Sequence, residues 1–245
     1  MDKQLALITG ASQGLGWEFC RQLVAAGHMV LLTARNLEKA EQAIADLPEE
    51  DRGRVRIYQL DVTDEGQIKS LAAEVKETFG QLDLLINNAG INSRSNSTHE
   101  QFLASVKLEG LDGDTLMRMI RINALSSVLM VKHFLPLLAE SSQAKVANIS
   151  SWIGSISQKN QGGNYGYAGS KALLNMFTRT MAHDLKAHGV NCIALNPGWV
   201  RTAMGGQRAN LSPEESVAGM LSVLDQLDEE SRGKFLQWDG SEHPW

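Results

Sequence analysis

Cysteine and clustered histidine are scarce in this chain. Its 245 residues contain two cysteines, Cys20 and Cys192, which lie in separate predicted elements. Two isolated cysteines form no disulfide framework and are typical of reduced thiols in the cytosol, so we expect a cytoplasmic protein. The six histidines show no metal-ligand spacing, because even His183 and His188 are five residues apart and do not share a helix face well. The sequence therefore predicts neither a disulfide-stabilised fold nor a metal centre.

Excess positive charge and long hydrophobic runs are also absent. The 23 basic and 28 acidic side chains give a formal net charge of −5, whereas a nucleic-acid-binding surface is basic. No apolar run reaches the roughly 18 residues of a membrane span. A strand is predicted from Leu5, which leaves no room for a signal peptide. We expect a soluble protein whose partners include neither nucleic acid nor membrane.

Short apolar runs and amphipathic patterns alternate along the whole chain. Strands are expected at residues 5–8, 28–34, 55–60, 82–86, 146–149, 190–195 and 234–237. Helices are expected at residues 14–26, 37–47, 64–79, 114–138 and 167–188, with another after the N-cap Ser212 and a loop at 92–99. Gly27, Gly80 and Gly189 are expected to end helices, and Pro136 to bend or end one. This alternation predicts a single α/β domain over residues 1–245, a Rossmann-like doubly wound parallel sheet with helices on both faces.

A glycine-rich segment follows the first predicted strand. Gly10 suits a tight turn, and Gly14 and Gly16 open the helix behind it, with the spacing Gly-x-x-x-Gly-x-Gly. The free N–H groups at the start of a helix attract a pyrophosphate, so the segment predicts a seat for a dinucleotide. The alternative is an ordinary strand–turn–helix connection that binds no ligand.

Tyr167 and Lys171 are four residues apart in a predicted helix, so they lie on one face, one turn from each other. A free phenol has a pKa near ~10 and is a poor base at neutral pH, whereas a neighbouring ammonium favours the phenolate. We therefore expect this pair to exchange a proton with an alcohol or a carbonyl near pH 7. Tyr165 has no such partner, because its fourth neighbour is Gly169.

The candidate site residues follow the carboxyl ends of the predicted strands. In strand order they are Gly10, Arg35, Asp61, the triplet Asn88, Ala89 and Gly90, the pair Ser150 and Ser151, and the pair Pro197 and Gly198. Ligands of open parallel sheets bind at this edge, where the strand order reverses. The sequence thus predicts that all these residues border one site.

These motifs, in this order, resemble the classical short-chain dehydrogenase/reductase family over essentially all 245 residues. The matching elements are Thr9-Gly-x-x-x-Gly-x-Gly16, Asp61-Val62, Asn87-Asn88-Ala89-Gly90, Asn123, Ser150-Ser151, Tyr167-x-x-x-Lys171 and Asn196-Pro197-Gly198-x-x-x-Thr202. Within the family, residues 196–206 and 233–240 are most similar to the small carbonyl reductases of the sniffer and C-factor type. Sixteen positions separate Ser151 from Tyr167, more than in the commonest family pattern, and we expect the extra loop to border the substrate.

The resemblance implies four catalytic residues. Tyr167 would act as general acid or base, and Lys171 would lower the pKa of the phenol and hold the nicotinamide ribose. Ser151 would bond the substrate oxygen, and the side chain of Asn123 could hold a water that leads protons to Lys171. The resemblance also implies cofactor contacts from Gly10, Ser12, Gln13, Gly14, Leu15, Gly16, Arg35, Asp61, Val62, Asn88, Ala89, Gly90, Tyr167, Lys171, Pro197, Gly198, Val200 and Thr202.

Arg35 favours NADP(H) over NAD(H). Sites for NAD usually present a carboxylate at the end of the second strand, and here that position is Ala34. The guanidinium of Arg35 would grip a phosphate bidentately, whereas a carboxylate would repel it. The alternative is an ordinary surface arginine.

The sequence predicts an NADP(H)-dependent carbonyl reductase acting on a small-molecule ketone, quinone or aldehyde, with a pocket bordered by Trp152, Ile153, Trp199 and Met204. One alternative is a cofactor-binding signalling or regulatory protein of the C-factor type with little turnover. Another is an alcohol dehydrogenase for a lipid or polyol. Surplus apolar residues on the helices at 114–138 and 167–188 predict a homodimer or homotetramer.

Overall fold

The computed structural model describes residues 3–92 and 106–245, so the loop expected at 92–99 lies almost wholly outside the described residues. The strands are β1 (Leu5–Ile8), β2 (Met29–Ala34), β3 (Val55–Gln59), β4 (Leu84–Asn87), β5 (Lys145–Ile149), β6 (Asn191–Asn196) and β7 (Phe235–Gln237). The helices are α1 (Gly14–Ala25), α2 (Leu37–Ala45), α3 (Glu49–Arg52), α4 (Glu65–Phe79), α6 (Gly113–Ile120), α7 (Ser126–Leu138), α8 (Tyr165–Leu185) and α9 (Pro213–Asp225). Within the described residues, no helix is long and apolar enough to cross a membrane.

All seven strands form one parallel sheet in the order β3-β2-β1-β4-β5-β6-β7. The chain builds outward from β1 to β3 on one side, then returns to place β4 on the other side of β1 and continues to β7. The strand order therefore reverses between β1 and β4, and their carboxyl ends open toward the same edge. The predicted fold class is confirmed.

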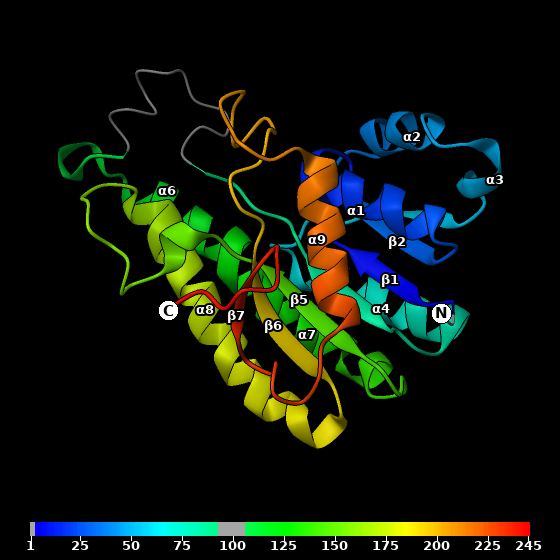
Figure 1. Ribbon diagram of the computed structural model, residues 1–245. Helices are drawn as coiled ribbons and strands as arrows, with labels where there is room; N and C mark the ends of the chain where they lie inside the picture. Colours follow the sequence, from blue (N-terminus) through cyan, green and yellow to red (C-terminus); the bar gives the residue numbers. More distant parts are fainter. Residues whose placement is uncertain (1–2, 93–105) are drawn as a thin grey trace.

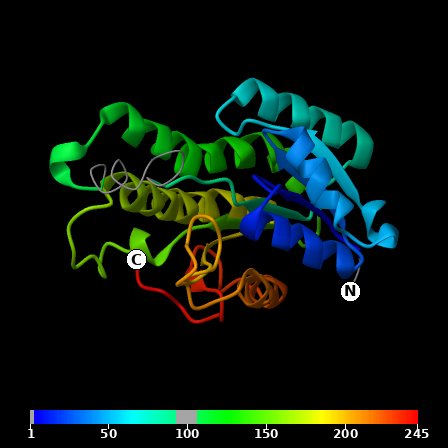
Figure 2. The same cartoon turned by 90° about the horizontal axis from the view of Figure 1, so that it is seen from above.

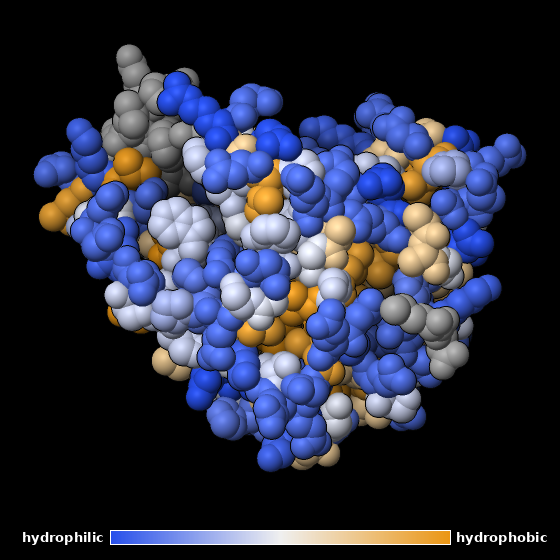
Figure 3. Space-filling view, viewed as in Figure 1, coloured by the Kyte–Doolittle hydropathy of each residue, from blue (hydrophilic) through white to orange (hydrophobic). Residues whose placement is uncertain are grey.

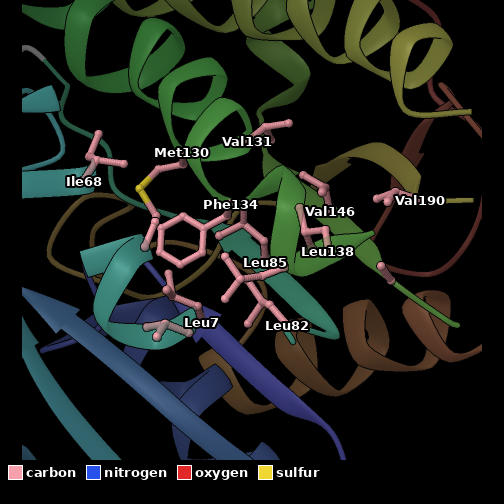
Figure 4. Close-up of a cluster of buried hydrophobic side chains, with 14 of the residues drawn as sticks. Leu7, Ile68, Leu82, Leu85, Met130, Val131, Phe134, Leu138, Val146 and Val190 are labelled. Atoms are coloured by element: carbon pink, nitrogen blue, oxygen red, sulfur yellow. The ribbon is translucent and has the colours of Figure 1, made fainter. Parts of the chain in front are cut away.

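Helices cover both faces of the sheet, because alternate strand residues point to opposite sides. Leu7 and Leu85 pack with residues of α4, α7 and α8, whereas Ile8 and Ile86 pack with residues of α1 and α9. Figures 1 and 2 show these two helix layers on either side of the strands. In the first layer, the fully buried ring of Phe134 lies among the leucines of the sheet (Figure 4). Each large apolar side chain buried in this way contributes roughly 1.5–3 kcal/mol.

Most helix ends follow the residues that predicted them. Gly27, Gly80 and Gly189 all adopt positive φ angles just past helices, where a residue without a β-carbon avoids strain. Before α9, the Ser212 hydroxyl accepts a hydrogen bond from the Glu215 N–H, and the Glu215 carboxylate accepts one from the Ser212 N–H. This reciprocal pair is the predicted capping box.

The long helix expected at residues 114–138 differs from the prediction. It begins at Gly113, and a π-helical turn, η2 (Arg121–Leu125), separates α6 from α7. Pro136 lies inside α7, which ends at Leu138. The helix expected at 167–188 begins earlier, at Tyr165, and its last turn tightens into a 3-10 turn at Lys186–His188. A π turn adds one residue to a helical turn without changing the hydrophobic pattern enough to be recognised in the sequence.

Candidate functional site

A cavity of about 390 Å³ opens at the carboxyl ends of the strands, beside the place where their order reverses. Most of the residues that the sequence assigns to a cofactor line it. These are Gly10, Ser12, Gln13, Gly14, Leu15, Arg35, Asp61, Val62, Asn88, Ala89, Gly90, Tyr167, Lys171, Pro197 and Thr202. The lining also includes Ser150 and Met204, which the sequence placed at the site and at its pocket. Residues that sequence reasoning missed are Ala34, Asn36, Lys39, Leu60, Ile91, Ile122, Ile149 and Ala203.

The glycine turn after β1 is fixed to the segment after β4. Gly10 has a φ of +64°, and the Thr9 hydroxyl accepts hydrogen bonds from the N–H groups of Asn88 (2.9 Å) and Ala89 (3.0 Å). A β-carbon on Gly16 would contact the Asn88 amide and lie 2.7 Å from the Gly10 carbonyl oxygen. Gly16 lies outside the cavity lining and packs closely within this turn, and its contact with a cofactor stays a prediction.

Two basic side chains stand at the β2 end of the cavity. Arg35 follows β2 directly, and Lys39 lies in the first turn of α2, whose N-cap Asn36 accepts a hydrogen bond from the Lys39 N–H (3.0 Å). Both side chains are exposed, and Ala34 leaves no carboxylate between them and the cavity. The detectable signal for Lys39 was its position four residues after Arg35, at the start of the helix expected at 37–47. Together the two cations form a site suited to a phosphate.

Asp61 lies beside this basic end. Burial acts to raise the pKa of its carboxyl, but hydrogen bonds from the N–H and hydroxyl of Thr63 lower it, and Arg35 and Arg118 lower it further. The net result is a pKa below the usual range for aspartate. Asp61 therefore remains an anionic hydrogen-bond acceptor in the cavity wall at neutral pH.

Tyr167 and Lys171 occupy the other end of the cavity, one turn apart on α8. The Lys171 ammonium donates a hydrogen bond to the Ile149 carbonyl oxygen (2.7 Å) and lies 5.8 Å from the centroid of the Tyr167 ring. Burial lowers the pKa of Lys171 to about 8. Burial also raises the pKa of the Tyr167 phenol, although a hydrogen bond with Ser151 acts in the opposite direction. The expected lowering of the phenol pKa by Lys171 is thus not seen, because desolvation outweighs a charge at this distance.

The serine pair after β5 divides between two tasks. The Ser150 hydroxyl donates a hydrogen bond to the side-chain oxygen of Asn175 in α8 (2.6 Å). The Ser151 hydroxyl accepts from the Ile153 N–H at 3.4 Å, a weak contact, and reaches the Tyr167 phenol. This arrangement favours Ser151 as the serine that faces a reacting oxygen.

Asn123 lies in the π turn and outside the cavity lining. Its side-chain oxygen accepts from the Ile91 N–H (2.8 Å), and its amide donates to the Ile91 carbonyl (2.8 Å) and the Ser170 hydroxyl (2.9 Å). That this side chain holds a water stays a prediction. Through these bonds Asn123 joins Ile91, after β4, to Ser170 of α8, the residue before Lys171. It thereby positions the segment after β4 and this turn of α8.

The segment after β6 forms a short flap over the Tyr167 end. Gly198 has a φ of +77°, and Val200 is buried and bridged to Leu211, so both shape this flap and neither lines the cavity. Met204 does line the cavity, and its sulfur accepts a hydrogen bond from the Tyr167 hydroxyl (3.8 Å). Trp199 donates to the Gly205 carbonyl (2.8 Å) and is about half exposed. Trp152 is also about half exposed, so neither tryptophan is buried in the core of this chain.

Known proteins share this arrangement of strands and motifs. The model of the short chain dehydrogenase family matches residues 4–211. A curated relative, C-signal of Myxococcus xanthus, is 39% identical over 166 residues, which cover 68% of this chain and 94% of that protein. NADPH-bound carbonyl reductase from chicken fatty liver superposes over 100% of both chains with a TM-score of 0.88 and 34% identity. Carbonyl reductase Sniffer of D. melanogaster superposes equally well, at 28% identity over 100% of both chains. The predicted resemblance is confirmed.

Proposed function

Because the chain belongs to the short chain dehydrogenase family of oxidoreductases, we propose that it is an NADP(H)-dependent carbonyl reductase. The observation that carries the proposal is the distribution of groups along one cavity. Two cations, Arg35 and Lys39, stand at one end, and the proton donor Tyr167 with its neighbour Lys171 stands at the other. A phosphate-bearing dinucleotide is the ligand class whose two ends match these groups.

The cofactor fits the residues at both ends. The glycine turn provides backbone N–H groups at the start of α1, which suit a pyrophosphate. Arg35 and Lys39 would hold a 2′-phosphate, and Ala34 offers no carboxylate to repel it. At the far end, a β-carbon on Gly90 would lie 3.8 Å from the Lys171 ammonium, so this glycine keeps the approach to Lys171 open. The NADPH carried by the chicken reductase supports the same choice of cofactor.

The chain's own groups perform the proton half of the reaction. When bound, NADPH supplies a hydride that adds to the carbonyl carbon, and it is oxidised to NADP⁺. Tyr167 donates its hydroxyl proton to the carbonyl oxygen, which becomes the alcohol. The raised pKa of Tyr167 supports its role as an acid, since the phenol stays protonated at neutral pH. Ser151 would donate a hydrogen bond to the same oxygen as negative charge develops on it.

Lys171 would restore the proton to Tyr167. Its pKa of about 8 lets it hold a proton at neutral pH and release one readily. Its buried position and its bond to the Ile149 carbonyl keep the ammonium one turn below the phenol. As in the family resemblance, we assign it the nicotinamide ribose as a further partner.

The substrate we propose is a ketone, quinone or reactive aldehyde with an apolar body. Met204 lies against the reacting phenol. Trp152 follows Ser151 in sequence, Trp199 precedes Met204 by five residues, and both are about half exposed. These side chains support an apolar entrance that is open rather than enclosed. The test is consumption of NADPH, followed by absorbance, over a panel of ketones, quinones and aldehydes. Tyr167→Phe is the blank, and a panel on which wild type and blank do not differ would contradict the proposal.

A cofactor-binding signalling protein with little turnover is the second candidate, and the 39% identity to C-signal favours it. It requires NADPH to bind and no tested carbonyl to be reduced. A lipid or polyol dehydrogenase is the third, and it requires NADP⁺ reduction by such alcohols to exceed the reverse rate. The same panel, run in both directions, separates all three.

We also propose that the protein is a homodimer or homotetramer paired through α6, α7 and α8. Most apolar residues of these helices are buried or half-buried. Met117 of α6 and Met176 of α8 remain exposed, as does Leu125 in the π turn between α6 and α7. By contrast, hydrophilic residues cover most of the face on which α9 lies, which is the face seen in Figure 3. Light scattering over a dilution series tests the proposal. A mass near 26.8 kDa at every concentration would overturn it.

A further inference from the structure

Residues 241–245 double back beside β7 and end next to the segment that follows Ser151. Leu236 of β7 forms an antiparallel bridge with Glu242, and the His243 N–H donates to the Phe235 carbonyl (2.7 Å). Figures 1 and 2 show the end of the chain beside the loop between β5 and α8. We call residues 241–245 the return segment and residues 152–158 the wall segment.

Aromatic contacts hold the return segment in place. The Trp245 ring stacks on Phe235, with centroids 5.5 Å apart and planes at 28°, and Phe235 is fully buried. The His243 ring meets the same phenyl ring edge-on at 4.9 Å. On the other side, the Arg179 guanidinium of α8 lies 5.8 Å from the Trp245 ring. Trp245 is thus fixed between the last strand and α8.

The return segment contacts the wall segment directly. The Ser157 N–H donates a hydrogen bond to the Trp245 carbonyl oxygen (2.9 Å). The His243 ring lies against the backbone of Trp152, the residue immediately after Ser151. These contacts span about ninety positions of sequence, unlike the local bonds of the wall segment, such as that between the Ser155 and Ser157 hydroxyls (3.4 Å).

Among the described hydrogen bonds, the other long-range bonds of the wall segment are at Trp152 and Gly154, and those at residues 155–158 are local, such as the bond from the Gln158 N–H to the Ser155 hydroxyl (3.3 Å). At its start, the Trp152 N–H donates to the Asn196 side chain (3.2 Å), and Gly154 packs against the backbone of Lys171. Beyond it, the Lys159 ammonium donates to the Gly163 carbonyl (3.2 Å). Between these points, Ser157 relies on Trp245 for its long-range bond.

We propose that Trp245 and His243 are positioning residues for the carbonyl substrate, acting through the wall segment; this rests on the proposed function. The wall segment presents Trp152 (52% exposed) and Ile156 (75% exposed), two large apolar side chains with little cover from the rest of the chain. Both follow the candidate serine closely in sequence. The start of the wall segment packs on α8, since a β-carbon on Gly154 would lie 2.9 Å from Lys171, so fixing this backbone would fix an apolar surface near the reacting groups and select substrates with a bulky apolar body.

The test compares Trp245→Ala with Trp245→Phe, which keeps a ring on Phe235 and Arg179. Glu242→Ala is the matched control, because Glu242 lies in the return segment but pairs only loosely with Lys234 (3.7 Å). Hydrogen–deuterium exchange of a peptide covering residues 152–158 measures, without any substrate, how firmly the return segment holds the wall segment. We expect exchange of this peptide to rise roughly tenfold in Trp245→Ala and to stay near wild type in the other two variants.

Kinetics then measure the consequence for substrate. In Trp245→Ala, KM for a bulky apolar carbonyl should rise roughly five- to tenfold, the loss expected for one hydrogen bond and one ring contact. KM for a small carbonyl and Kd for NADPH, measured by cofactor fluorescence, should stay within about twofold, because they depend on other segments. Trp245→Phe should restore the KM for the bulky carbonyl.

Three results would overturn the inference. Unchanged exchange at residues 152–158 in Trp245→Ala would show that the return segment does not hold the wall segment. Increased exchange with an unchanged KM, or an equal loss of NADPH binding and turnover, would reduce Trp245 to a purely structural role. If no carbonyl is reduced even by wild type, the proposed function fails. The exchange result still decides whether the return segment holds the wall segment.

Discussion

The two ends of the cavity are built in different ways. At the β2 end, the lining comes from short contiguous stretches, residues 10–15 and 34–39, and the path of the first is set by glycine backbone. At the Tyr167 end, residues of β5, α8 and the flap after β6 meet. Most of the lining at the first end comes from two short stretches, with Thr9 bonded to the segment after β4, whereas the second end is assembled from residues far apart in sequence.

The electrostatics of the two ends differ in the same way. Arg35 and Lys39 are exposed and keep their charges in water, where they attract a phosphate at little cost. Lys171 is 4% exposed, and burial lowers its pKa to about 8, close to the pH at which it would act. Charge for binding is therefore placed at the surface, and groups for proton transfer are buried.

The largest effect should come from Tyr167→Phe. Removing the phenolic hydroxyl should lower kcat by roughly 10²–10⁴, because the forming alkoxide loses its acid. Kd for NADPH should change no more than a few-fold, since the proposed cofactor contacts lie mainly elsewhere in the cavity. Steady-state kinetics and NADPH fluorescence measure the two quantities separately.

Tyr165→Phe is the matched control for that experiment. Tyr165 begins α8 two residues earlier, is 45% exposed and lies outside the cavity lining. It should keep nearly full activity. If Tyr167→Phe retains more than about a tenth of the wild-type kcat, another acid supplies the proton and the division between the two ends is misplaced.

Arg35→Ala should produce the next largest effect, at the opposite end. Losing one charge-assisted contact to a phosphate costs about 1.5–3 kcal/mol, so KM for NADPH should rise roughly tenfold or more, while KM for NADH stays nearly constant. Lys39→Ala should shift the same ratio in the same direction by less. Lys69→Ala, an exposed lysine of α4 outside the cavity lining, is the control. A wild-type preference for NADH would refute the cofactor assignment.

The locally encoded features were those the sequence predicted best. The alternating apolar runs predicted a doubly wound parallel sheet and the site edge, and Gly10 identifies the turn because its positive φ suits glycine. What the sequence did not predict are contacts that depend on distant neighbours. The contact of Met204 with Tyr167 spans 37 positions, and the partners of Asn123 follow from a π turn that leaves no clear sequence pattern. The raised pKa of Tyr167 reflects burial, which no spacing of residues reports.

Gly16→Ala should destabilise the cofactor end through packing alone. Gly16 has an ordinary φ, but a β-carbon there would press on the Asn88 side chain and lie 2.9 Å from the Ala11 Cα. Overpacking of this kind costs roughly 1–3 kcal/mol, and it should raise Kd for NADPH as well. Gly53→Ala is the control, since a β-carbon at Gly53 meets no atom within 4 Å. Equal melting temperatures for the two variants would contradict the tight turn described at Gly16.

The smallest effect should have the opposite sign. Gly169 lies in α8 between Tyr167 and Lys171, is exposed, and a β-carbon there would meet no atom within 4 Å. Alanine is favoured over glycine in a helix by about 0.8–1.0 kcal/mol, so Gly169→Ala should raise the melting temperature by roughly 2–4 °C. Gly166→Ala in the same helix should lower it, because its β-carbon would lie 2.7 Å from the Met119 sulfur. Calorimetry measures both shifts, and kcat should not change in Gly169→Ala. A fall in kcat there would mean that the Tyr167 end, unlike the glycine turn, requires freedom of the backbone rather than space, and the contrast between the two ends would have to be redrawn.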